Sequence, residues 1–73
     1  MEVREYNLIF TRQDDLNTLE WLTFERYMFE HGATLLNDAN NIYNIEFWGN
    51  DLTLTELITD LGSLELKLNK EGV

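Results

Sequence analysis

The sequence predicts an α+β domain in which two helices cover one face of a four-stranded antiparallel sheet. Each strong strand candidate alternates apolar and polar side chains, as a sheet does when one face is buried and the other meets water. Two longer segments carry apolar residues at helical spacing, and they separate the strands in the order β-α-β-β-α-β. A chain of 73 residues without cysteine predicts a single domain, residues 1–73, that no disulfide stabilises.

Four strand candidates are defined by alternation and by the turn-forming residues beside them. They span residues 3–10, 33–36, 42–48 and 63–70. In the three stronger candidates the apolar side chains share one face, and these side chains are Tyr6, Leu8 and Phe10, then Tyr43, Ile45 and Phe47, then Leu64, Leu66 and Leu68. Asparagine and aspartate at residues 37–41 predict a turn between the second and third strands.

Two helix candidates lie between the strands. The first spans residues 16–29, follows polar capping residues at 11–15 and ends at His31 and Gly32. The second is predicted to begin at Thr53, because Thr53 and Glu56 have the spacing of a capping box. Its apolar residues follow the i, i+3, i+4, i+7 pattern, and they are Leu54, Leu57, Ile58 and Leu61. Gly62 suits the position just beyond the helix.

The order of these elements resembles the ferredoxin-like split βαβ arrangement, with two helices on one face of an antiparallel sheet. The resemblance is one of element order, covers nearly the whole chain and includes no family motif. It implies an architecture and no activity, because this fold carries many unrelated functions.

The first helix carries large apolar residues on two sides. At about 100° per residue, the two stripes are Leu19, Leu22 and Phe29 on one side, and Trp21, Phe24 and Met28 on another. Each large side chain left in water forgoes on the order of 1.5–3 kcal/mol. Either the sheet, second helix and loops bury both stripes, or one stripe is a contact surface for another chain. We expect the stripe of Trp21 to face outward, because the leucines of the other stripe are typical core residues.

The chain is strongly acidic, with fourteen acidic and five basic residues and a formal net charge of −9. This charge argues against direct binding of nucleic acid or of an anionic membrane. It speeds encounter with a basic partner, although solubility explains it equally well. The N-terminal residues lack the basic region of a signal peptide, and no apolar run is long enough to span a membrane. These features predict a cytoplasmic protein.

No residue pattern indicates catalysis, a metal site or a cofactor. The only histidine, His31, lies at a predicted helix end, which favours a capping role. Carboxylates are numerous, but Asp14 and Asp15 lie at a predicted helix start, where negative charge is stabilising. Residues 37–41 lack the spacing of a calcium-binding loop, and the dispersed glycines form no phosphate cradle. We therefore expect a protein that is not an enzyme and that binds no cofactor.

The leading hypothesis is a non-enzymatic binding protein that covers a basic, nucleic-acid-facing surface of another protein, such as a nuclease. Its candidate partner-binding residues combine aromatic anchors with acidic side chains, and they are Trp21, Phe24, Met28, Glu20, Glu25, Glu46 and Trp48. Glu5, Glu46 and Glu65 are expected on the open face of the sheet, together with Trp48. Small acidic proteins without cysteine resemble the inhibitors that phages and plasmids direct against host nucleases and defence complexes, anti-CRISPR proteins included.

The alternative belongs to a different class. The chain is then a self-associating regulatory or ligand-binding module of ACT-like architecture, and the acidity serves solubility alone. A homodimer forms through the second stripe of the first helix or through an edge strand. A stable symmetric dimer whose interface contains Trp21 or Met28 distinguishes this alternative from the first hypothesis.

Overall fold

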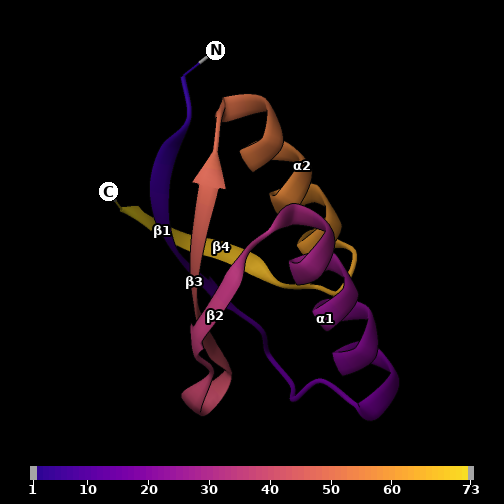
Figure 1. Ribbon diagram of the computed structural model, residues 1–73. Coiled ribbons are helices and arrows are strands. Elements are labelled where there is room, and N and C mark those ends of the chain that lie inside the picture. The colour runs from indigo at the N-terminus through magenta and orange to yellow at the C-terminus, as the bar shows by residue number, and fades with distance from the viewer. Residues whose placement is uncertain (1, 73) are drawn as a thin grey trace.

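The computed structural model describes residues 2–72 and places four strands and two α-helices in the order expected from the sequence. The elements are β1 (Arg4–Thr11), α1 (Thr18–His31), β2 (Thr34–Asn37), β3 (Ile42–Gly49), α2 (Asp51–Gly62) and β4 (Lys67–Gly72), with a short 3₁₀ turn, η1 (Ala39–Asn41), between β2 and β3. The strands form one antiparallel sheet in the order β2-β3-β1-β4. Both helices pack on one face of this sheet, and the opposite face carries no helix of the described residues (Figure 1). The fold is therefore α+β and ferredoxin-like.

The core lies between the sheet and the two helices. The inward faces of β1 and β3 are those that alternation predicts, and their register pairs Tyr6 with Phe47, Leu8 with Ile45 and Phe10 with Tyr43. The helices and loops complete the buried cluster with Phe24, Met28, Leu54, Leu57 and Leu61, and with Leu16, Leu64 and Leu66. Because these side chains come from all the long elements, burial in the core joins the sheet to both helices.

Both helices begin at an asparagine cap. At α1, the Asn17 side chain accepts a hydrogen bond from the Glu20 amide (2.8 Å), and the Glu20 carboxylate accepts one from the Asn17 amide (2.9 Å). Asn50 and Thr53 form the same reciprocal pair at α2. The prediction that Thr53 and Glu56 form the capping box is therefore wrong, because Asn50 is the N-cap and Thr53 lies inside the first helical turn.

Left-handed residues end α1 and shape the turn before β3. Gly32 has a φ of 64°, and the amides of Gly32 and Ala33 both donate to the Met28 carbonyl at the end of α1. Asn40 and Asn41 have φ values of 56° and 60°, a region that asparagine tolerates better than most residues. The helix end at Gly32 and the turn at residues 37–41 are both confirmed.

The connection from α2 to β4 differs from the prediction. Gly62 belongs to α2, because the Ser63 amide still donates to carbonyls of the last helical turn. Glu65 adopts a φ of 64°, and β4 begins only after this turn rather than at residue 63. Leu64 and Leu66 are buried as predicted, but they reach the core from the turn and not from a strand. Alternation in this segment therefore reflects burial on one side of a compact turn.

Candidate interaction surfaces

The two apolar stripes of α1 face the opposite way from the sequence prediction. Phe24 and Met28 are buried, with 1% and 6% of their surface exposed. Trp21 is half-buried beside them, and its ring centre lies 5.4 Å from that of Phe24 and 6.0 Å from that of Tyr43. The prediction that Trp21, Phe24 and Met28 face outward is therefore wrong. The rings of Trp21 and Phe24 pack against Tyr43 of β3, and aromatic side chains offer the largest apolar area for burial.

The outward side of α1 carries the apolar residues that were expected in the core. We name them the α1 stripe, and they are Leu19, Leu22 and Phe29, exposed by 74%, 58% and 87%. Helical spacing places the exposed residues Glu25, Arg26 and Glu30 beside or between them. The α1 stripe is thus an apolar line bordered mainly by acidic side chains, and apolar side chains with a charged border are typical of protein interfaces.

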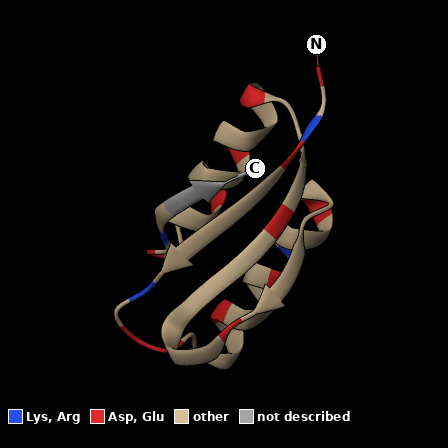
Figure 2. Cartoon of the chain, turned by 90° about the vertical axis from the view of Figure 1, so that its left-hand side faces the viewer, with Lys and Arg blue, Asp and Glu red and all other residues tan. Residues whose placement is uncertain are grey.

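The face of the sheet that the helices leave uncovered forms a second surface, which we name the open sheet face. Figure 2 looks onto it, with the helices behind. Its central residues alternate with the buried ones, and they are Glu5, Asn7, Ile9 and Thr11 of β1 and Ile42, Asn44, Glu46 and Trp48 of β3. Trp48 is 57% exposed and lies directly opposite Glu5 in the register. Alternation correctly placed Glu46 and Trp48 on this uncovered face.

Two acidic side chains lie close together on the open sheet face. Glu46 is two residues before Trp48 on β3 and lies opposite Asn7, so it is diagonal to Glu5 on β1. The hydrogen bond with Glu46 raises the pKa of Glu5, and partial burial and the like charge of Glu46 raise it further. Glu5 therefore holds a proton more tightly than an isolated glutamate does.

Glu20, a candidate partner-binding residue, is part of an internal network. The Arg12 side chain is only 8% exposed, and its guanidinium donates from Nη2 to the Glu20 carboxylate at 2.8 Å. Its Nε donates to the Leu64 carbonyl, and its Nη1 donates to the carbonyls of Asp14 and Asp15, all within 2.9 Å. Arg12 thus ties the end of β1 to the start of α1 and to the α2–β4 turn. No sequence pattern indicates this role, because three of its four acceptors are backbone carbonyls.

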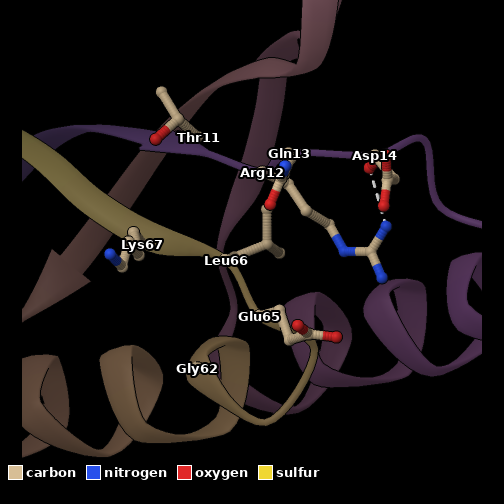
Figure 3. A pocket seen from close by; sticks show the side chains of 8 residues that line it. All are labelled: Thr11, Arg12, Gln13, Asp14, Gly62, Glu65, Leu66 and Lys67. Carbon is tan, nitrogen blue, oxygen red and sulfur yellow. Dashed lines mark hydrogen bonds between the residues drawn. The ribbon is translucent and has the colours of Figure 1, made fainter.

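A hollow of about 700 Å³ lies next to Arg12, and the side chains around it are drawn in Figure 3. Arg12, Asp14, Glu65 and Lys67 contribute its charged lining. Because the Arg12 guanidinium is already held by four hydrogen bonds, it has little capacity left for a ligand. We therefore assign Arg12 a structural role.

His31 links the two helices. One ring nitrogen lies 2.7 Å from the Asp60 carboxylate of α2, and the His31 side chain is 14% exposed. The residue stands in the last turn of α1, as predicted, where a positive charge is favoured by the helix dipole. Glu30 and Glu56 line a shallow groove of about 400 Å³ beside this pair. The groove adds acidic character to the helical side of the molecule.

The candidate residues therefore divide between separate parts of the molecule. Glu46 and Trp48 share the open sheet face, Glu25 borders the α1 stripe, and the other four are buried or engaged in internal contacts. Among residues 2–69, whose side chains the structure describes, no three side chains that ligate metals lie together, and no helix of the described residues has the length and apolar character needed to cross a membrane. No protein-family model, curated protein or solved structure matches this chain.

Proposed function

We propose that the protein is a non-enzymatic acidic binding protein that covers a basic, nucleic-acid-binding surface of another protein. The observation that carries this proposal is the excess of exposed acidic side chains over exposed basic ones among the described residues. Arg12 donates hydrogen bonds within the protein, and Arg4 pairs with Asp51 at 3.2 Å. Most acidic side chains of the described residues are exposed. Their positions are spread over the sheet, the helices and the loops (Figure 2), so negative charge occurs on several sides of the molecule.

Exposed acids occur on both helices, in the α2–β4 turn and on the open sheet face. They include Glu25 and Glu30 on α1, Asp51 and Glu56 on α2, Glu65 in the α2–β4 turn, and the half-exposed pair Glu5 and Glu46 on the open sheet face. Such a surface acts as a nucleic-acid mimic, because it offers anionic oxygens to the same lysine and arginine side chains that hold phosphates. The apolar α1 stripe and Trp48 supply the anchors that charge alone does not give.

An inhibitor of phage or plasmid type, directed against a host nuclease or defence complex such as a CRISPR effector, fits this description. Its binding is tested with purified nucleic-acid-binding proteins from its native setting, at about 0.1 M and 1 M salt, where the Debye length falls from about 10 Å to about 3 Å. We expect binding at low salt that weakens steeply with salt, and competition with the target's own DNA or RNA. If no such protein binds at low salt, or if nucleic acid does not compete, the proposal is wrong.

A second candidate function is self-association, as in the regulatory or ligand-binding modules of ACT-like architecture. The exposed α1 stripe favours it, because Leu19, Leu22 and Phe29 forgo on the order of 1.5–3 kcal/mol each while they remain in water. Light scattering over a wide concentration range measures the solution mass. A dimer that the Phe29→Ser variant dissociates supports this candidate, whereas a monomer at every concentration excludes it.

A further inference from the structure

We propose that the open sheet face binds one arginine side chain of a basic partner protein, with the guanidinium stacked on Trp48 and its N–H groups directed to Glu5 and Glu46. This inference rests on the proposed function, since it names the chemical group of the partner that the acidic surface receives. It also limits that group to one place on the surface. The proposal depends on the position, charge and exposure of these three residues.

The sheet register brings the three side chains around one point. Glu5 lies directly opposite Trp48 on the neighbouring strand, a relation that separates Cβ atoms by about 4.5–5.5 Å. Glu46 precedes Trp48 by two residues on the same face of β3, which corresponds to about 6.6 Å along a strand. A guanidinium is of a size to contact all three side chains at once.

Among the described side chains, no basic residue pairs with Glu5 or Glu46. Within the described side chains, the ion pairs of the protein join Arg4 to Asp51, Arg12 to Glu20 and His31 to Asp60. Arg4 is next to Glu5 in sequence, but it points to the other side of the strand, where it lies over the Tyr6 ring and contacts Asp51. The Glu5 and Glu46 carboxyls therefore face solvent as a like-charged pair, and a cation from outside relieves their repulsion.

Trp48 makes arginine a better occupant than lysine. Its indole is exposed, no helix of the described residues covers it, and it takes part in none of their aromatic pairs. A planar guanidinium stacks on an indole and at the same time donates two parallel hydrogen bonds to a carboxylate, whereas an ammonium ion acts as a point charge. Asn7, opposite Glu46, and the half-buried Ile9 continue the same face and offer contacts to the chain that carries the arginine.

The first experiment compares two peptides of equal charge, acetyl-(Gly-Arg)₄-amide and acetyl-(Gly-Lys)₄-amide, as probes at low salt. Binding is followed by NMR through the indole N–H of Trp48, which the Trp48→Phe variant assigns. We expect the arginine peptide to bind at least about threefold more tightly than the lysine peptide and to shift the Trp48 signal most. Equal affinity for the two peptides, or unchanged Trp48 signals, overturns the proposal.

Matched variants then separate this site from the general acidic field. We expect Glu5→Gln with Glu46→Gln to weaken arginine-peptide binding about tenfold, and Glu25→Gln with Glu30→Gln, which removes the same charge from α1, to weaken it less than twofold. Trp48→Ala should make the affinities for the arginine and lysine peptides equal. Thermal unfolding of each variant verifies that it folds. If both pairs of variants weaken binding equally, the site proposal fails while the proposed function stands. A further variant combines all four substitutions. If it binds a native basic partner as tightly as the wild type does, the proposed function fails as well.

The pH dependence of binding gives a second readout that a structural role of these residues does not predict. Because the hydrogen bond with Glu46 raises the pKa of Glu5, Glu5 loses its negative charge at a higher pH than an isolated glutamate does as the pH falls. Arginine-peptide binding should therefore weaken on acidification, and this dependence should disappear in the Glu5→Gln, Glu46→Gln variant. A pH dependence that persists in that variant assigns the binding to other carboxylates and overturns the proposal.

Discussion

The two sides of α1 carry similar residue types and meet opposite surroundings. On the inner side, the rings of Trp21 and Phe24 pack at tilted angles against Tyr43 of β3, and Met28 completes the packing. On the outer side, the three residues of the α1 stripe remain in water. The difference shows that apolar residues on a helix are buried only where another element of the fold packs over them. In this chain the single sheet covers one side and α2 packs beside the helix, so no element of the described residues covers the outer side.

The comparison predicts unequal effects of removing a phenylalanine ring from the two sides. Phe24→Ala leaves a cavity among aromatic rings and should lower the free energy of unfolding by about 3–5 kcal/mol. Phe29→Ala, the matched control on the outer side, should change it by less than about 0.5 kcal/mol. Urea unfolding followed by circular dichroism measures both values, and Phe24→Leu provides a milder variant if Phe24→Ala does not fold. Similar losses for the two positions would contradict the assignment of the inner side.

A second contrast separates a buried cation from exposed ones. Arg12→Ala removes four hydrogen bonds and leaves Glu20 and backbone carbonyls without their donor, so we expect a loss of about 2–4 kcal/mol. Lys67→Ala, which removes the same charge from an exposed position, should cost less than about 0.5 kcal/mol. The same unfolding measurement compares them. An Arg12 variant as stable as the Lys67 variant would show that the network does not hold the loops together.

The strands were easier to predict from the sequence than the buried side of α1, because apolar residues repeat differently along a strand and along a helix. A strand has only two faces, and in β1 and β3 the apolar residues that share a face with Tyr6 and with Ile45 show which face is buried. This is why the fold and the exposure of Trp48 were predictable. Around α1 the pattern left two possible inner sides, and the choice depends on the aromatic packing of Tyr43, which is distant in sequence. Arg12 was missed because backbone carbonyls leave no trace in residue types.

Close packing at the end of β3 gives a smaller effect. A Cβ atom at Gly49 would collide with Thr53 Oγ1 and with the Phe47 ring. Thr53 Oγ1 takes part in the cap of α2, and the Phe47 ring lies in the core. We expect Gly49→Ala to lower the free energy of unfolding by about 1–3 kcal/mol. Gly62→Ala is the control, because open space surrounds that position at the end of α2, and it should stabilise by about 0.5–1 kcal/mol. The opposite signs can be measured in one set of urea titrations.

The smallest expected effect compares the open sheet face with the outer side of α1 through pH. Because the hydrogen bond with Glu46 raises the pKa of Glu5 in the folded protein, the folded state binds this proton more tightly than the unfolded chain does. The stability that this proton contributes is therefore fully present below the pKa of Glu5 in the unfolded chain. It is lost as the pH rises through the higher pKa of Glu5 in the folded protein. Glu5→Gln should accordingly raise the melting temperature at pH 7, with a smaller gain or none near pH 4. Glu25→Gln removes the same charge from an exposed position on α1 and is the matched control. A melting temperature for Glu5→Gln that is unchanged or lower at pH 7 would mean that the carboxyl pair costs the fold nothing, and that the open sheet face stores no repulsion for a partner's cation to relieve.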